Sequence, residues 1–215
     1  MELSLTVIII VITSIISFTA FSNRKVISDL IFYPPAVSQR NQWYRFFSSG
    51  LIHADFGHLF FNMFSLYFLG RFVEVEFAKL FGASGKWIYL ALYVSGLLFS
   101  ILPTYFKHKN DVDYRSLGAS GAVSAVIFAG LLLVPDVELY VYFIKMPGFI
   151  FAPLYLIFSI IMERNGKDNV NHSAHIWGSI YGLVFTVIAC QLINYPVLQN
   201  GFASIKAYMQ SRGWF

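Results

Sequence analysis

Long apolar runs separated by short polar stretches dominate the hydropathy pattern of this chain. A helix needs roughly 20 mainly apolar residues to cross the hydrocarbon core of a bilayer. Six runs come near this length, namely residues 3–21, 56–70, 87–106, 118–134, 147–162 and 173–193. The pattern therefore predicts an all-α, polytopic membrane protein that forms one six-helix bundle over residues 1–215.

Two further stretches carry aromatic residues among polar ones. Residues 23–55 include Trp43 and Tyr44, and the tail after Pro196 mixes aromatics with Lys206 and Arg212. Aromatic and basic side chains of this kind favour the headgroup region of a bilayer, so we expect both stretches at the interface. The first apolar run is interpreted as a retained span, because Glu2 stands where a signal peptide carries positive charge.

The composition agrees with a membrane protein. The chain is 57% apolar and 12% charged, with a mean hydropathy of +0.64, whereas soluble domains carry about 25% charged residues. Its single cysteine, Cys190, excludes an intrachain disulfide and a cysteine-based zinc cluster, and is interpreted as a small packing residue. The net charge of +4 is spread without a block of like charges, so we expect no nucleic-acid partner.

Polar residues near the starts of three apolar runs are expected to gather at one membrane face. Consecutive spans alternate in direction, so the second, fourth and sixth begin on the same side. His58 and Asn62 lie in the second span, Ser120 opens the fourth, and His175 opens the sixth. Polar groups inside spans are costly and usually face the bundle interior or a water-filled cavity, which makes them candidate functional residues.

Small residues recur every four positions beside the serine and the histidine. Gly121, Ala125 and Ala129 follow Ser120, and the run Ala174, Gly178, Gly182 brackets His175. Such ladders let helix backbones come close in lipid. A serine hydroxyl becomes nucleophilic when a base lies within about 2.6–3.2 Å. Close helix approach would allow that distance, although the ladders are also typical of plain packing seams.

These residues together resemble a known family, the rhomboid intramembrane serine proteases. The resemblance rests on an ordered set of motifs: Gly118-Ala119-Ser120-Gly121, Ala174-His175 followed by Gly178 and Gly182, the set His53, His58 and Asn62, and Arg45 in the preceding loop. It covers the chain from about Trp43 to Gly182. It implies a rhomboid-like bundle and an endopeptidase that cleaves transmembrane segments of membrane proteins near the membrane surface.

The resemblance also implies roles for individual residues. Ser120 would be the nucleophile, and His175 the general base and then the general acid of a Ser–His dyad. His58 and Asn62, with the Ser120 backbone N–H, would hold the oxyanion, and Gly118 is assigned to the same oxyanion and substrate-binding region. No cofactor and no metal are expected. The partners implied are transmembrane protein substrates and the lipid bilayer, in a prokaryotic plasma membrane.

Access to a buried serine requires an entrance. Gly148 and Pro153 weaken the fifth span, since proline removes a helix hydrogen bond, so this span is the expected gate. The polar loop 164–172 is the expected cap over the site.

Other serines and histidines are interpreted as structural or surface residues. Ser84 lies in a second Gly82-Ala83-Ser84-Gly85 run, at the opposite membrane face, and is expected in a surface turn. His108 and His172 are expected in loops. His53 lies five residues from His58, on a different helical face, and is expected to stabilise the loop junction.

Two features depart from the resemblance. Many relatives carry an aromatic residue four positions after the nucleophile, where this chain has Ser124, so an aromatic from elsewhere would have to hold the histidine. The family orientation puts the N-terminus in the cytoplasm and the site near the outer face. It leaves six of the 15 Lys and Arg residues inside, against the positive-inside rule.

Three alternatives remain open. A non-catalytic rhomboid-like protein could bind membrane segments without cleaving them, although such proteins typically lack the Ser or the His. A His-based membrane metalloprotein could use His53, His58, His172 and His175, but the chain lacks His-Glu-x-x-His spacing. A purely structural or transport bundle would leave the clustered polar residues unexplained.

Overall fold

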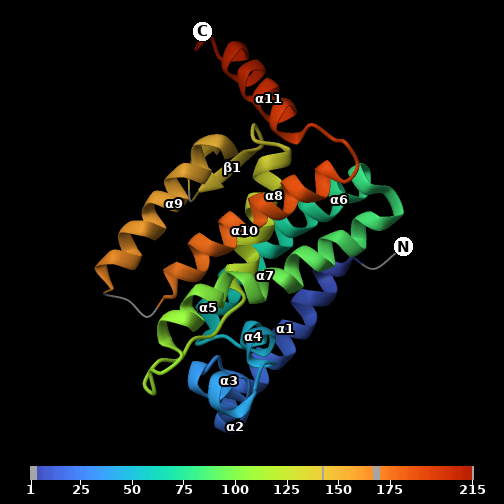
Figure 1. Ribbon diagram of the computed structural model, residues 1–215. Coiled ribbons are helices and arrows are strands. Elements are labelled where there is room, and N and C mark those ends of the chain that lie inside the picture. Colours follow the sequence, from blue (N-terminus) through green and yellow to red (C-terminus); the bar gives the residue numbers. More distant parts are fainter. Residues whose placement is uncertain (1–3, 142, 167–169, 215) are drawn as a thin grey trace.

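The computed structural model describes residues 4–141, 143–166 and 170–214. In that part of the chain the polypeptide is mainly helical, with one two-stranded hairpin (Figure 1). The longer elements, in chain order, are α1 (Leu5–Ser22), α5 (Phe56–Ser65), α6 (Arg71–Phe81), α7 (Gly85–His108), α8 (Ser120–Leu133), α9 (Gly148–Asn165), α10 (His172–Gln191) and α11 (Val197–Ser211).

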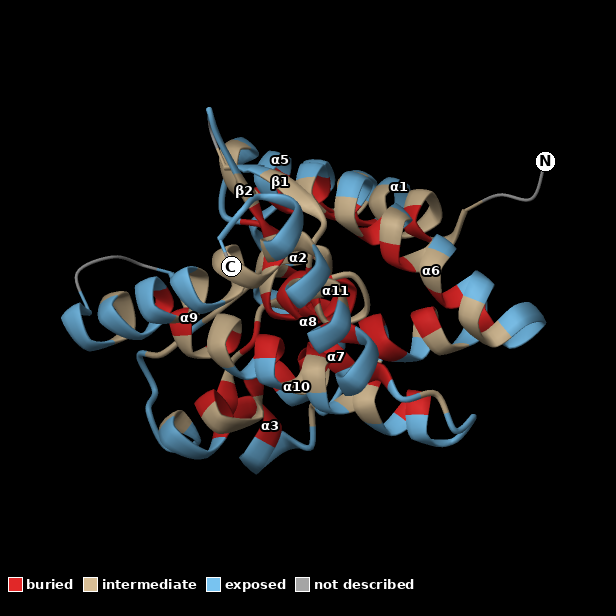
Figure 2. Ribbon diagram, turned by 90° about the horizontal axis from the view of Figure 1, so that it is seen from above, coloured by how far each residue is buried: buried red, intermediate tan, exposed pale blue. Residues whose placement is uncertain are grey.

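Helix α8 forms the centre of the molecule. It packs against α7 and α10, and ten of its 14 residues are buried (Figures 1 and 2). Its sequence is small and apolar on every side, which is typical of a helix buried on all faces. The serine that begins α8 therefore lies at the end of the most enclosed of the long helices in the described structure.

Within the described residues, four helical runs are long and apolar enough to cross a membrane: Leu5–Ser22, Phe56–His108, Gly148–Asn165 and His172–Gln191. The 53-residue run reverses at the 3₁₀ turn η3 (Gly82–Ser84), after which α7 packs against α6. Helix α8 is a shorter apolar helix of 14 residues. The protein is thus a multi-pass helical membrane protein, as predicted.

The second helical span is longer than the sequence analysis predicted. We expected it to end at residue 70, before the charges of Arg71, Glu74 and Glu76, but the helix continues through a π-helical turn, η2 (Leu66–Gly70), into α6. Glu74 explains why a charge is tolerated there. Its carboxylate accepts hydrogen bonds from the backbone N–H of Leu5 at 2.7 Å and from the Thr6 hydroxyl at 2.7 Å, and so caps α1.

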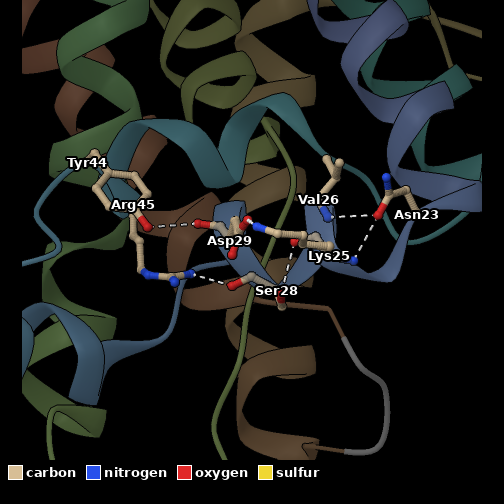
Figure 3. Close-up of polar contacts among 7 residues, drawn as sticks. All are labelled: Asn23, Lys25, Val26, Ser28, Asp29, Tyr44 and Arg45. Carbon is tan, nitrogen blue, oxygen red and sulfur yellow. Dashed lines mark hydrogen bonds and ion pairs between the residues drawn. The ribbon is translucent and has the colours of Figure 1, made fainter.

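Residues 23–55 fold into short helices: α2 (Arg24–Leu30), α3 (Pro34–Arg40), α4 (Arg45–Ser48) and the 3₁₀ turn η1 (Ser49–Leu51). Arg45 holds them together, because its guanidinium donates to the carbonyl oxygens of Ser28 at 2.9 Å and Ile31 at 2.6 Å. The neighbouring Tyr44 hydroxyl donates to the carbonyl oxygen of Asp29 (Figure 3). Whether this segment lies in the headgroup region stays a prediction.

A β-hairpin that the sequence analysis did not predict lies between α8 and α9. Strand β1 (Glu138–Val141) pairs antiparallel with β2 (Ile144–Pro147). Glu138 forms ion pairs with Lys145 of the hairpin and with Arg212, which follows α11. These ion pairs tether the C-terminal helix, which we expected only as an interfacial segment, to the hairpin (Figure 1). They also lower the pKa of Glu138, mainly through the hydrogen bond from Lys145.

Candidate active site

Ser120 and His175 lie in direct contact although 55 residues separate them. The distance between His175 Nε2 and Ser120 Oγ is 2.8 Å. This distance fits a hydrogen bond between a nucleophile and its base. Ser120 is the first residue of α8, and His175 lies in the first turn of α10. Both helices begin at the same end of the bundle, as their parity predicted.

Glycines let α8 and α10 approach closely enough for this contact. A Cβ atom at Gly178 would collide with the carbonyl oxygen of Gly121, and one at Gly182 would collide with that of Ala125. The two ladders of small residues therefore face each other, one on each helix. Their spacing brings the start of α10 against the start of α8, where the serine and the histidine lie.

Asn171 sets where α10 begins. Its side-chain oxygen accepts a hydrogen bond from the backbone N–H of Ala174 at 3.0 Å, the bond expected of an N-cap residue. Its amide nitrogen lies 3.3 Å from Ser116 Oγ, in the segment that leads into α8. Asn171 thus links the starts of the two helices. Sequence reasoning missed it, although an asparagine directly before an apolar helix is a recognisable cap signal.

Gly118 shapes the segment before Ser120. Its φ of 111° is unfavourable for residues with a side chain. A Cβ there would lie 2.6 Å from Cε1 of His58, so the imidazole of His58 packs directly on the Gly118 backbone. The Gly118 N–H donates to the carbonyl oxygen of Ser49. A glycine at this position is therefore required both by the backbone and by the neighbouring ring.

His53 holds the backbone of the segment that leads into Ser120. It is 1% exposed, and its Nε2 accepts a hydrogen bond from the Ala119 N–H at 3.4 Å. Its Nδ1 lies 3.0 Å from Ser17 Oγ, and that hydroxyl donates to the Leu51 carbonyl. Burial, and secondly the proximity of His58, lower the pKa of His53 to about 3. A neutral His53 suits these bonds, which agree with the structural role we expected.

The predicted site residues surround one cavity of about 550 Å³. Its lining includes all five of them: His58, Asn62, Gly118, Ser120 and His175. Asn62 is 7% exposed, and its amide nitrogen donates to the carbonyl oxygen of His58 at 2.9 Å. The first N–H groups of a helix have no intrahelical acceptor, so the start of α8 offers donors to an anionic oxygen beside Ser120.

A tyrosine that sequence reasoning missed contacts the histidine. Tyr155, on α9, lies with its ring centroid 6.3 Å from that of His175 and with an interplanar angle of 27°. Its hydroxyl is 2.8 Å from Ser124 Oγ. An aromatic from elsewhere in the chain therefore lies on the imidazole. No spacing within the sequence indicates this, because Tyr155 follows Ser124 by 31 residues.

Two of the secondary assignments were wrong. His172 is not a loop residue but the first residue of α10; it is 5% exposed, and its ring centroid lies 5.5 Å from that of His175. The cap of Asn171 starts the helix one residue earlier than expected. His108 ends α7 and stacks on Tyr114 with a centroid distance of 3.8 Å, rather than lying free in solvent.

The assignments of Ser84 and Cys190 agree with the structure. Ser84 lies exposed in the turn η3, and Cys190 is fully buried. In the described ranges no group of three or more His, Cys, Asp or Glu residues lies close enough to hold a metal ion. The histidines form two ring pairs instead, His53 with His58 and His172 with His175. Part of the expected cap, residues 167–169, lies outside the described residues.

Fold and site together define a class: a multi-pass helical membrane protein with a serine–histidine pair at the starts of two helices packed together, α8 and α10. The family model for the Rhomboid domain matches residues 40–192. The chain belongs to the rhomboid family, which confirms the resemblance inferred from the motifs.

Curated relatives carry rhomboid names at low identity. Rhomboid protease AarA of Providencia stuartii is 23% identical over 86% of this chain and 77% of its own length. The putative rhomboid protease YdcA of Bacillus subtilis is 25% identical over 70% of this chain and 69% of its own length. RHOMBOID-like protein 12, mitochondrial, of Arabidopsis thaliana is 28% identical over 61% of this chain, which spans 42% of that relative's length.

Proposed function

We propose that this protein is an intramembrane serine endopeptidase that cleaves transmembrane segments of membrane proteins near the membrane surface. The observation that carries the proposal is the 2.8 Å contact between His175 Nε2 and Ser120 Oγ. Membership of the rhomboid family and the names of two bacterial relatives support it.

The chemistry follows from the contact. His175 Nε2 takes the proton of the Ser120 hydroxyl as Oγ attacks the scissile carbonyl carbon. The tetrahedral intermediate collapses to an acyl-enzyme when the peptide C–N bond breaks, and the imidazolium gives its proton to the leaving amine. A water molecule, deprotonated by the same imidazole, then hydrolyses the ester and frees Ser120.

The oxyanion of the intermediate would be held at the wall formed by α5 and the start of α8. The Ser120 N–H, the His58 ring and the Asn62 amide are the candidate donors, and all three residues line the cavity. Losing one such donor costs roughly 3–4 kcal/mol of transition-state stabilisation in serine hydrolases. Gly118 would keep this wall open, because a side chain there would occupy the space of the His58 ring.

The substrate class is the one that the resemblance to rhomboid proteases implies, a membrane segment unwound near the surface. The place of the cavity supports it, because the pocket lies at one end of a bundle of helices long enough to cross a membrane. Helix α9 remains the proposed gate, since it contains Pro153 and buries Gly148 and Ser159 while most of its other residues are exposed or half-buried. We propose that the protein lies in a prokaryotic plasma membrane, with its N-terminus in the cytoplasm.

The test compares the serines of the two Gly-Ala-Ser-Gly runs in the chain, Ser120 and Ser84. Purified protein is treated with a fluorophosphonate probe and, separately, incubated with a model transmembrane substrate. We expect Ser120→Ala to abolish both labelling and cleavage, because the nucleophile is gone. Ser84→Ala, which removes the hydroxyl of the exposed turn in Gly82-Ala83-Ser84-Gly85, is expected to keep wild-type rates.

The outcomes separate the alternatives. Undiminished labelling of Ser120→Ala would refute the proposed nucleophile. A wild-type protein that binds membrane segments but neither reacts with the probe nor cleaves would favour the non-catalytic rhomboid-like reading. Cleavage that resists the probe and is lost with chelators would favour the metalloprotein reading.

A further inference from the structure

The buried hydroxyl of Ser124 has a specific partner on another helix. Ser124 lies one turn after Ser120 on α8 and is 2% exposed. Its Oγ is 2.8 Å from the Tyr155 hydroxyl of α9. A buried polar side chain needs such a partner, because an unpaired hydroxyl loses its hydrogen bonds to water without replacement. The bond fixes the end of the Tyr155 side chain at a point one helical turn from the nucleophile.

The same tyrosine ring lies on the catalytic candidate His175. The centroids are 6.3 Å apart, and the planes are inclined by only 27°. Phe128 of α8 and Phe151 of α9 also pack against the Tyr155 ring, with centroid distances of 5.6 and 5.7 Å. Neighbours on α8, α9 and α10 therefore confine Tyr155, and its ring lies where it can limit rotation of the imidazole.

We propose that Tyr155, anchored by Ser124, is the positioning residue of His175, and that it makes the readiness of the base depend on the position of α9. The inference rests on the proposed function. It concerns how the base is held and not which residues react.

Stacking matters here because the base must hold one orientation. The imidazole can accept the Ser120 proton only while Nε2 points to Oγ, and a displacement of about 1 Å costs roughly 100-fold in rate. The ring restricts that motion.

The coupling to α9 follows from where each residue resides. Ser120 and Ser124 lie on α8 and His175 lies on α10, which are packed together, whereas Tyr155 belongs to α9 at the edge of the bundle (Figures 1 and 2). Any displacement of α9 that admits a substrate through this side draws the ring away from His175. The base is therefore fully oriented only when α9 has returned, so cleavage follows closure.

The experiment compares variants by the second-order rate of fluorophosphonate labelling at Ser120 and by kcat and KM for a model transmembrane substrate. Tyr155→Leu removes ring and hydroxyl. We expect it to lower the labelling rate and kcat by about 10- to 100-fold while KM stays constant, because transition-state alignment and not binding is lost. Leu154→Ala, on the half-exposed neighbouring position of α9, is the matched control and keeps the wild-type values.

A double-mutant cycle separates positioning from general stability. Ser124→Ala and Tyr155→Phe break the same hydrogen bond from either side, so each is expected to lower the labelling rate by about 3- to 10-fold. Their combination is expected to do no more than either alone. These conservative variants decide the question even if Tyr155→Leu fails to fold.

Two results would overturn the inference. One is a wild-type labelling rate in folded Tyr155→Leu; the other is a double variant whose loss equals the product of the single losses. Both leave the proposed function intact as long as wild type is labelled and Ser120→Ala is not. Absence of labelling in wild type itself would instead refute the proposed function.

Discussion

At the scale of single residues, the neighbours of Ser120 decide where its hydroxyl lies. Gly118 takes a backbone conformation with φ of 111°, and its Cα faces the His58 ring without room for a side chain. The next N–H, that of Ala119, is bound by the buried His53. The segment is therefore held from both sides before the helix begins, and the first residue of α8 has little freedom.

Gly118→Ala tests this arrangement. The added methyl group would clash with His58 and impose about 1–2 kcal/mol of backbone strain, so we expect labelling at Ser120 to fall by roughly 100-fold or more. The measurement is the labelling rate in detergent, with folding checked by thermal denaturation. Gly166→Ala is the control, because its φ is 55° but, apart from its chain neighbours, no atom of the described residues lies within 4 Å of its added Cβ. Equal rates in both variants would contradict the proposed role of Gly118.

At the scale of elements, the contact between α8 and α10 creates the serine–histidine distance. Neither helix carries both residues, and the hydrogen bond exists because Gly178 and Gly182 let α10 rest on backbone carbonyls of α8. Asn171 then sets the start of α10 so that His175 falls opposite Ser120. The small-residue ladder is thus both a packing seam and the device that aligns the site.

Gly178→Ala is expected to separate the helices. Its Cβ would collide with the Gly121 carbonyl oxygen. Overpacking of this kind costs about 1–3 kcal/mol, and a shift of α10 by about 1 Å would lower the labelling rate roughly 100-fold. The labelling rate and the melting temperature are measured together.

Gly201→Ala on α11 is the matched control, since its nearest neighbour would be the Leu132 oxygen at 3.5 Å, an ordinary contact. We expect this variant to keep the wild-type labelling rate and to be at least as stable, because alanine favours a helix by about 1 kcal/mol over glycine. Wild-type labelling by Gly178→Ala would show that close approach at this position is not required.

At the scale of the whole molecule, packing is uneven. Helix α8 is enclosed by α7 and α10, whereas α9 lies at the edge and buries Gly148 and Ser159 (Figure 2). Pro153 removes one hydrogen bond from the interior of α9. This contrast places the most enclosed long helix behind Ser120, which begins it, and the least enclosed long helix next to His175, which its Tyr155 contacts.

Hydrogen–deuterium exchange in detergent measures this contrast. We expect the amides of α9 around Pro153 to exchange at least about tenfold faster than those in the middle of α8, because local opening of α9 exposes few buried groups. Equal protection of the two helices would contradict a gating role for α9. The comparison is made within one sample, so detergent and pH are the same for both.

Much of the fold and of the candidate site could be predicted from the sequence. Apolar runs of spanning length predicted the multi-pass helical fold, since hydrocarbon leaves a backbone few other ways to satisfy its hydrogen bonds. Helix parity and the four-residue ladders predicted that Ser120 and His175 would meet at one end of the bundle. These properties are periodic and local, so the order of residue types along the chain carries them.

Other features depended on contacts between distant segments. The sequence analysis ended the second span before Glu74 because of its charge. In the structure the helix continues, and the Glu74 carboxylate caps α1. Tyr155 had no signal at all, because its partners Ser124 and His175 lie on two other helices, 31 and 20 residues away along the chain. The sequence by itself determined which helices form and where their polar residues lie. Only the tertiary structure decided which side chain steadies the histidine, because helix rotation and packing in three dimensions choose that neighbour.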